Sequence, residues 1–279
     1  MSETKKGLRL PKYSVLMSVY AGERAEFFEK SIESITSQTL PTDDFVIVCD
    51  GELTEELDKT LEQAQKKHPY INVVRSEKCG TGLCANKGLK ACRNEIMVKM
   101  DSDDIADRTR CEQMMRLFAL HPELDMAGAY IDEFDSDTGE HIAFKKTPVS
   151  NEEIRKYARR RNPFNNQTLC YKKSLALRVG GYSDIARCED YEFVVKMLMA
   201  GAIGRNIPKA LVRYRVNEGN YKRRSNWANT KAFIKVRFGN FRRGFSSLGD
   251  FIVPCLFQLF MFVMPSALTK VLYKRFLRG

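Results

Sequence analysis

The sequence predicts an α/β protein in which helices cover a mostly parallel central sheet. Strand-like and helix-like segments alternate along the first half of the chain, with no internal repeat or low-complexity tract. The chain has 279 residues, of which 43% are hydrophobic, so it is long enough to bury a large core in one or two domains. Repeated β and α units build a parallel sheet, because each crossover helix returns the chain to the end of the sheet at which the previous strand began.

The expected strands of the first half are short apolar runs, which we place at residues 14–19, 45–49, 71–75, 96–100 and 125–131. The first helix is indicated by Phe28, Ile32 and Ile35, which recur at helical spacing. The helices that follow are expected at residues 54–67, 83–92 and 108–121.

Beyond a turn expected at residues 135–140, the strict alternation loosens. Helices are expected at 151–161 and 191–200, an extended segment at 167–171, a turn at 180–181 and a strand at 210–216. Gly201 stands where it would end the helix before it.

The charge of the chain is concentrated near its end. The net charge is +11, but residues 205–279 hold 16 Lys and Arg residues and only two acids, Glu218 and Asp250. An uncharged run of 19 residues at 251–269, broken by Pro254 and Pro265, follows a basic and aromatic stretch at 221–243. We therefore expect a catalytic domain at residues 1–216 and a helical segment for membrane association at 217–279.

This tail is expected to lie on an anionic membrane surface rather than to cross it, because Lys and Arg flank the apolar run on both sides. A plain amphipathic helix packed on the body is an alternative. RNA binding would also suit a basic, aromatic tail. It does not explain the uncharged run at 251–269, so no nucleic-acid partner is expected.

The remaining composition points to a cytosolic body. The opening residues lack the apolar core of a secretory signal, and no apolar run in the first 250 positions could cross a bilayer. The eight cysteines form no CxxC pair and are expected to be free thiols.

An acidic cluster, Asp101-Ser102-Asp103-Asp104, follows the fourth expected strand. Ligands of doubly wound sheets bind at the carboxyl ends of the strands. Asp101 and Asp103 would point to the same side of an extended chain, and their mutual repulsion favours a cation between them. Mn²⁺ or Mg²⁺ is the natural choice. Alternatively, the acids form a turn in which Asp104 or Asp107 caps the next helix.

Two further segments fall at the same edge of the expected sheet. Ser18-Val19-Tyr20-Ala21-Gly22 follows the first strand, and Asp50 follows the second. A glycine-bearing loop at 80–85 fits the G-x-G-x-x-G/A fingerprint of dinucleotide-binding folds, but it lies in the third β–α unit rather than the first. The alternative is a loop that approaches a nucleotide's edge, with Asn86 in the first turn of the helix.

A second acid pair, Glu189 and Asp190, directly precedes the helix expected at 191–200. One of these two acids could be explained structurally, because an acid at the start of a helix caps it and complements the helix dipole. The functional interpretation makes Asp190 a general base that takes the proton of an attacking hydroxyl.

Taken in order, these motifs resemble those of the family 2 glycosyltransferases, an inverting group with the GT-A fold. The resemblance covers residues 13 to about 216. It comprises the segments at 14–22, 50–51, 80–89, 100–104, 161–168, 180–182 and 188–192. Two positions depart from the usual pattern: Cys49 replaces one of two acids after the second strand, and Asn166 replaces a frequent histidine.

The resemblance implies a sugar nucleotide held at the carboxyl edge of the sheet. Asp50 would read the base, Asp101 would lie near the ribose, Asp103 would carry the metal ion and Asp190 would be the catalytic base. The remaining positions expected to contact substrate are Val19, Tyr20, Asn86, Asn166 and Glu189.

The expected activity is inverting transfer of a hexosyl group from a nucleotide-diphosphate sugar, with a UDP-sugar favoured. The acceptor would be a hydroxyl of a lipid-linked glycan at the cytoplasmic face of the inner membrane, in polysaccharide, capsule or O-antigen assembly. The alternative is a non-catalytic protein that binds a sugar nucleotide or RNA.

Overall fold

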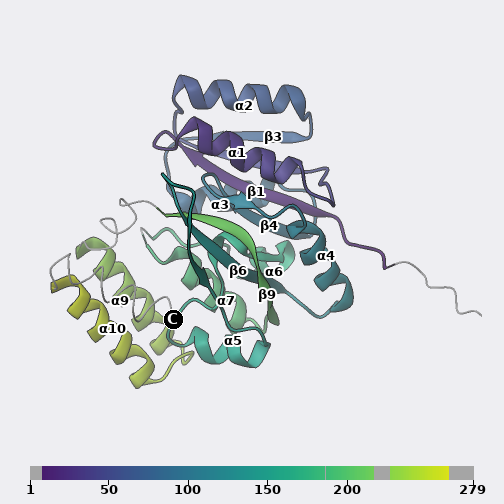
Figure 1. Cartoon of the computed structure of the whole chain (residues 1–279). Helices are drawn as coiled ribbons and strands as arrows, with labels where there is room; N and C mark the ends of the chain where they lie inside the picture. The colour runs from purple at the N-terminus through teal and green to yellow at the C-terminus, as the bar shows by residue number, and fades with distance from the viewer. Residues whose placement is uncertain (1–7, 186, 217–226, 264–279) are drawn as a thin grey trace, which may run out of the picture.

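The computed structural model describes residues 8–185, 187–216 and 227–263. Its centre is a nine-stranded sheet with the order β3-β2-β1-β4-β8-β6-β9-β5, and β7 pairs with β6 (Figure 1). The strands are β1 (Tyr13–Tyr20), β2 (Phe45–Asp50), β3 (Ile71–Ser76), β4 (Ile96–Asp101), β5 (Ile105–Ala106), β6 (Met126–Asp135), β7 (His141–Lys145), β8 (Cys170–Lys172) and β9 (Gly204–Val216). The α/β prediction is confirmed.

The helices are α1 (Ala25–Thr36), α2 (Glu55–Lys67), α3 (Thr81–Ala91), α4 (Arg110–Leu120), α5 (Asn151–Ala158), α6 (Lys173–Arg178), α7 (Glu189–Met199), α9 (Trp227–Arg242) and α10 (Leu248–Val263). A short 3-10 helix, η1 (Asn166–Thr168), precedes β8.

Side chains alternate between the two faces of the sheet, as the period of a β-strand requires. In β1, Val15, Met17 and Val19 enter one core together with residues of α1, α2 and α4. Leu16 enters a second core, formed with α3, α5, α6 and α7. Helix α3 lies so close to the sheet that a Cβ on Gly88 would approach the Leu16 Cδ1 atom to 2.1 Å.

The parallel part of the sheet is narrower than the sequence predicts. Strands β3, β2, β1 and β4 are all parallel, and so are β6 and β9. In contrast, β8 runs antiparallel to both β4 and β6, and β5 and β7 also pair antiparallel. The sheet becomes mixed where the alternation of strands and helices loosens, and of these antiparallel pairs only β6 and β7 are joined by a short connection.

Most expected elements are found within a few residues of their predicted bounds. Several differ: β5, β7 and α6 have no counterpart in the predicted ranges, β9 begins at Gly204 rather than at 210, the segment at 167–171 divides into η1 and β8, and α7 begins at Glu189 rather than after Asp190. Pro254 does not interrupt α10 but lies inside it. Parts of the expected tail, at 217–226 and 264–279, lie outside the described residues.

The C-terminal helices pack on the body through α7. Val236 of α9 joins a small buried cluster with Tyr191 and Val195. The Arg160 side chain forms an ion pair with Asp250 at the start of α10, with an Nε–Oδ1 distance of 2.6 Å. No helix within the described ranges combines the length and apolar character needed to cross a membrane.

Arg110 of α4 joins the centre of the sheet to η1. The side chain is fully buried, and its Nη2 atom donates to the carbonyl oxygens of Lys99 and Gln167. Lys99 precedes the acidic cluster by two positions, and Gln167 follows Asn166. Arg110 therefore sets the spacing between two segments that carry expected site residues.

We predict that Arg110→Met lowers the free energy of unfolding by about 2–4 kcal/mol, because two buried carbonyl groups lose their partner. Chemical denaturation measures this change. The control is Arg116→Met on the same helix, whose exposed ion pair with Glu112 contributes no more than about 0.5 kcal/mol. Equal stabilities for the two variants would contradict the role given to Arg110.

Candidate active site

The carboxyl ends of β1, β2 and β4 bring the expected donor-binding residues together. Tyr20 pairs with Asp50, and Ser18 pairs with Asp101, in the registers of neighbouring parallel strands. A cavity of about 420 Å³ opens at this edge. Seven expected site residues line it: Val19, Tyr20, Asp50, Asp101, Asp103, Asn166 and Glu189.

Like charges crowd the floor of this cavity. Burial raises the pKa of Asp103 to about 7, and the neighbouring carboxylates of Asp101 and Glu23 add to the effect. Burial, together with the carboxylates of Asp103 and Asp101, also raises the pKa of Asp104 well above its usual range. An opposite charge brought into the cluster would relieve this repulsion.

The acidic loop is anchored from β9. Arg215 donates its backbone N–H to the Asp104 Oδ1 atom at 2.9 Å, and its Nε atom donates to the carbonyl oxygen of Asp103 at 2.9 Å. Its guanidinium group also lies over the Phe27 ring, 3.7 Å from the centroid. Asp104 thus supports the loop and does not cap α4, whose N-cap residue is Thr109.

The cluster fits a hard divalent cation. Asp101 and Asp103 both face the cavity, and the Oδ2 atom of buried Asp104 has no hydrogen-bond partner among the described residues. Mg²⁺ and Mn²⁺ commonly take one or two protein carboxylates and complete their shells with water and phosphate oxygens. Two carboxylates beside an open cavity are a ligand set of this kind.

Asp50 lies against the glycine-bearing loop. It accepts backbone N–H groups from Cys79 at 2.6 Å and from Gly80 at 3.2 Å. Burial acts to raise the pKa of Asp50, but these two hydrogen bonds, together with the Cys84 thiol and the charge of Lys78, outweigh it and lower the pKa. Since Gly80 donates to Asp50, its N–H is not available to a pyrophosphate, which argues against the dinucleotide fingerprint. Cys49 is buried in the core on the other side of the strand.

Two cysteines complete the surroundings of Asp50. Within the described part of the chain, Asp50, Cys79 and Cys84 are the only group of three His, Cys, Asp or Glu residues whose ligand atoms lie within 4.8 Å of one another. The Cys79 and Cys84 sulfur atoms are 3.4 Å apart. All eight cysteines are free thiols, as predicted.

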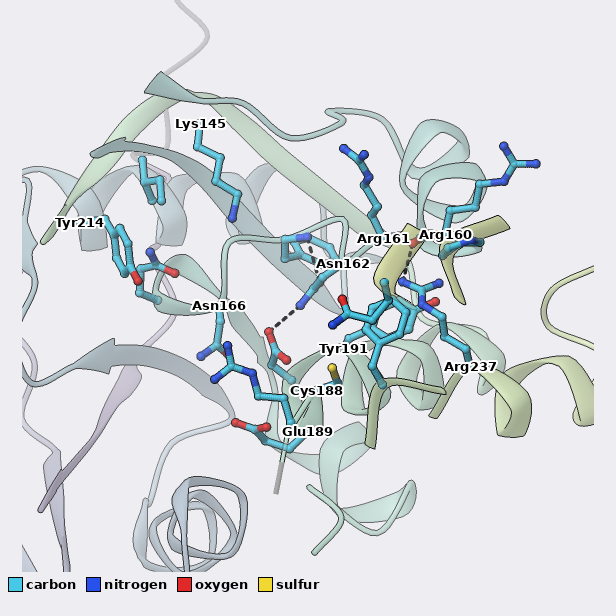
Figure 2. Close-up of a pocket in the computed structure, with 18 of the residues that line it drawn as sticks. Lys145, Arg160, Arg161, Asn162, Asn166, Cys188, Glu189, Tyr191, Tyr214 and Arg237 are labelled. Carbon is cyan, nitrogen blue, oxygen red and sulfur yellow. Dashed lines mark hydrogen bonds between the residues drawn. The ribbon is translucent and has the colours of Figure 1, made fainter. Parts of the chain in front are cut away.

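A second, larger cavity of about 780 Å³ adjoins the first. Four residues line both: Asp101, Asn166, Arg187 and Glu189. Asp190 lines only the larger cavity, where its Oδ2 atom accepts a hydrogen bond of 2.9 Å from the Asn162 Nδ2 atom (Figure 2). The smaller cavity is called the donor cavity below, because the residues expected to bind the donor line it. The expected base therefore faces the space beside the donor cavity.

The start of α7 is held in an unusual backbone conformation. Cys188, the N-cap residue, has a φ of 65° and is the only non-glycine residue with positive φ in the described ranges. This turn presents Glu189 and Asp190 in the first turn of the helix. Burial and the adjacent Asp190 carboxylate raise the pKa of Glu189.

Comparison with known proteins identifies the family. The family model "Glycosyl transferase family 2" matches residues 14–185. A protein of Haemophilus influenzae described as "Uncharacterized glycosyltransferase" is 33% identical over 267 residues, which is 96% of this chain and 99% of that protein. This chain belongs to glycosyltransferase family 2.

Two further similarities bear on the site of this glycosyltransferase. The "UDP-Gal:alpha-D-GlcNAc-diphosphoundecaprenol beta-1,3-galactosyltransferase" of Escherichia coli is 30% identical, covering 96% of this chain and 97% of that protein. The mannosyltransferase PcManGT of Pyrobaculum calidifontis, solved with GDP-Man and Mn²⁺, has a TM-score of 0.62 at 17% identity, covering 94% of this chain and 72% of that one. The second likeness concerns the fold, which is that of the GT-A glycosyltransferases.

Several residues that the sequence analysis missed line the site of this glycosyltransferase. Lys99, Glu23 and Arg187 all face the donor cavity. Lys99 is 5% exposed, and its Nζ atom donates to the Asn166 Oδ1 atom at 3.3 Å. A lone lysine within the apolar run Ile96–Asp101 is the signal that could have found it.

Asn86 lies apart from the other expected site residues and lines neither cavity. Its Nδ2 atom donates to the Tyr182 carbonyl and its Oδ1 atom accepts the Tyr182 N–H, both at 2.7 Å. Gly181 has a φ of +64°, and a Cβ there would approach the Asn86 Oδ1 atom to 2.2 Å. In this structure Asn86 holds the turn before α7.

We predict that Asn86→Ala lowers the free energy of unfolding by about 1–3 kcal/mol, because two partly buried hydrogen bonds are lost, but leaves the nucleotide Kd unchanged. Denaturation and nucleotide titration measure the two effects separately. Asn166→Ala, at the wall of the donor cavity, serves as the comparison and should raise the Kd. A Kd raised tenfold by Asn86→Ala would instead assign Asn86 to the substrate.

Proposed function

We propose that this glycosyltransferase moves a hexosyl group from a UDP-sugar to a hydroxyl of a lipid-linked glycan, with inversion at the anomeric carbon. The observation that carries the proposal is the meeting of two cavities at Glu189, with Asp190 next to it in the larger one. Donor and acceptor would approach one another at this junction. The name of the Escherichia coli relative supports both the UDP-sugar and the lipid-linked acceptor.

The donor would occupy the smaller cavity. Asp50 keeps acceptor capacity for a donor group of the base, since each carboxylate oxygen carries two lone pairs and the loop N–H groups use only part of them. Val19 and Tyr20 would flank the nucleoside, Asp101 would lie near the ribose, and Asn166 and Glu189 would contact the sugar.

Asp103, together with Asp101, would hold Mn²⁺ or Mg²⁺ against the diphosphate. The cation would neutralise the charge that builds on the phosphate oxygens as the glycosidic bond breaks. The crowding of carboxylates described above supports this assignment, because Asp101 and Glu23 add to the raised pKa of Asp103 and a bound cation would relieve their repulsion.

Asp190 would act as the general base on the acceptor side. The Asn162 amide orients its carboxylate and leaves the second oxygen to accept the hydroxyl proton. The proton would move to that oxygen mainly in the transition state. One base suffices for a single displacement, and attack opposite the leaving diphosphate gives a β-linked product from an α-linked donor.

We also propose that α10 rests on the anionic cytoplasmic face of the inner membrane in bacterial polysaccharide, capsule or O-antigen assembly. Ile252, Leu256 and Phe260 recur every fourth residue and form one exposed stripe, with Leu256 60% exposed. Burial of such a stripe in a lipid surface is favourable. The stripe has no charged or hydrogen-bonding group for RNA, which disfavours the alternative of a nucleic-acid-binding protein.

Two aspartate variants separate the roles proposed for the site. We predict that Asp190→Asn lowers the rate of transfer by about 10²–10⁴-fold and keeps Mn²⁺-dependent donor binding, because only proton transfer is lost. Asp103→Asn should lose the Mn²⁺-dependent binding itself. A thermal-shift screen of UDP-, GDP- and dTDP-sugars with and without Mn²⁺ selects the donor, and transfer assays follow.

The control for this pair is Asp58→Asn. Asp58 lies on α2 and outside both cavities, and the substitution removes its ion pair with Arg75 of β3. Wild-type transfer by Asp190→Asn would return this residue to a capping role. Unchanged Mn²⁺-dependent binding by Asp103→Asn would contradict the metal assignment.

The membrane proposal predicts that the double variant Leu256→Glu, Phe260→Glu binds vesicles containing phosphatidylglycerol at least about tenfold more weakly than the native chain, because two large apolar side chains no longer enter the lipid. Co-sedimentation measures the binding. Leu120→Glu on α4, at an equally exposed leucine, is the control. Undiminished sedimentation of the double variant would contradict membrane contact through α10.

A further inference from the structure

Arg237 of α9 is a buried cation with unused donors. It lines the larger cavity, yet its side chain is only 5% exposed. Its Nη2 atom donates to the Arg160 carbonyl oxygen, whereas its Nε and Nη1 atoms have no hydrogen-bond partner among the described residues. A buried guanidinium group with two orphaned N–H donors is costly unless an anion meets it.

The surroundings hold Arg237 in place without neutralising it. Its guanidinium carbon lies 4.4 Å from the Phe233 ring centroid and 4.9 Å from that of Tyr191. Tyr191 is itself fixed by a hydrogen bond of 2.7 Å from its hydroxyl to the Ala158 carbonyl. Aromatic faces stabilise the charge of the guanidinium plane and leave its edge for hydrogen bonds, which is the geometry that matches phosphate.

Other cations lie at the same wall of the cavity. Arg161 is exposed, and its guanidinium group makes no hydrogen bond or ion pair with the described residues. Arg160 is held by Asp250 and accepts the bond from Arg237 through its backbone. Figure 2 shows these three arginines on one side of the cavity and Asn166 with Glu189 on the other. The cavity therefore has three arginines on the side away from its junction with the donor cavity, where Arg187 and Glu189 line both cavities.

The third wall is apolar and belongs to the C-terminal helices. Phe233 of α9 and Val253, Pro254 and Phe257 of α10 line the same cavity. Val253 is 55% exposed and Phe257 is 41% exposed, and both lie beside the exposed stripe of α10. The cavity thus offers an anion the arginine wall and, next to it, an apolar path that leads outward.

We propose that Arg237 and Arg161 bind the phosphate of a lipid phosphate or diphosphate acceptor, with Arg160 positioning Arg237 and the lipid chain leaving along α10. The sugar of that acceptor then reaches the junction where Asp190 lies. This site is separate from the one for the donor diphosphate, because none of the three arginines lines the donor cavity. The inference rests on the proposed function only for the direction of the acceptor sugar.

The test is calorimetric titration of the full chain with farnesyl diphosphate, farnesol and inorganic pyrophosphate, each with and without UDP and Mn²⁺ to fill the donor cavity. The native chain should bind farnesyl diphosphate more tightly than either fragment. Arg237→Gln should raise the farnesyl diphosphate Kd by about 10–100-fold, the loss expected for a charged hydrogen-bonded pair, and Arg161→Gln by a smaller factor. Neither variant should change the weak binding of farnesol.

Matched controls lie on the same elements and outside both cavities: Arg242→Gln on α9 and Arg159→Gln at the end of α5. Both should keep the native Kd. Arg161→Gln keeps the test valid if Arg237→Gln fails to fold, because the Arg161 side chain is exposed.

Three results would overturn the proposal: an unchanged Kd in both variants, an equal loss of farnesol binding, or pyrophosphate binding as tightly as farnesyl diphosphate, which would indicate a site for free phosphate. Donor binding with Mn²⁺ is titrated separately. If the native chain does not bind the donor with Mn²⁺, the proposed donor is contradicted. The lipid phosphate site is judged only by the titration with farnesyl diphosphate.

Discussion

The site depends on a concentration of negative charge that the sheet imposes. Parallel strands end at the same edge, so the acids that follow β2 and β4 converge there regardless of their separation along the chain. Asp103 and Asp104 are held at this edge although burial and mutual repulsion raise the pKa of both. Arg215 of β9 holds the loop through its backbone N–H to the Asp104 carboxylate and its Nε atom to the Asp103 carbonyl oxygen, and the carboxylates of Asp101 and Asp103 face the cavity. A positively charged ligand in the cavity would relieve the repulsion between these carboxylates.

The same charge explains the division of the site into two sides. Asp101 and Asp103 face the donor cavity, where a bound cation would offset their charge toward a diphosphate, whereas Arg160, Arg161 and Arg237 line only the larger cavity. Glu189 lies where the two meet, and the left-handed backbone of Cys188 fixes the position of the pair at the start of α7. A non-glycine residue in this conformation costs about 1 kcal/mol or more, which the packing of α7 against the sheet must offset.

The sequence predicts the parts of this arrangement that are encoded locally. Apolar runs and helical spacing located β1, β2, β3 and β4 to within about two residues, because burial on both faces leaves a pattern that needs no knowledge of distant neighbours. The acids after those strands were found for the same reason. The antiparallel strands β5, β7 and β8 are short, and β5 and β8 pair with strands far along the chain, so the mixed part of the sheet was not predictable in this way.

Residues whose role depends on tertiary contacts escaped the sequence analysis. Arg110 reads as an ordinary helix residue until the carbonyl groups of Lys99 and Gln167 are placed beside it. Asn86 occupies a motif position, yet its partner is a turn nearly 100 residues away. Arg237 stands among Lys231, Lys235, Arg242 and Arg243, which are exposed, and only the structure distinguishes it by its burial and by two nitrogen atoms without a partner among the described residues.

The position of α9 bears on how the tail and the body work together. The sequence places a boundary at residue 216, with catalysis on one side and membrane association on the other. In the structure, α9 and α10 supply Phe233, Arg237 and Phe257 to the cavity that also contains Asp190. An element that rests on lipid and also forms a wall of this cavity can select a lipid-bound acceptor at the point where the acceptor leaves the membrane. Attachment and acceptor recognition would then be properties of one pair of helices, and removing the tail would open the acceptor cavity as well as release the protein.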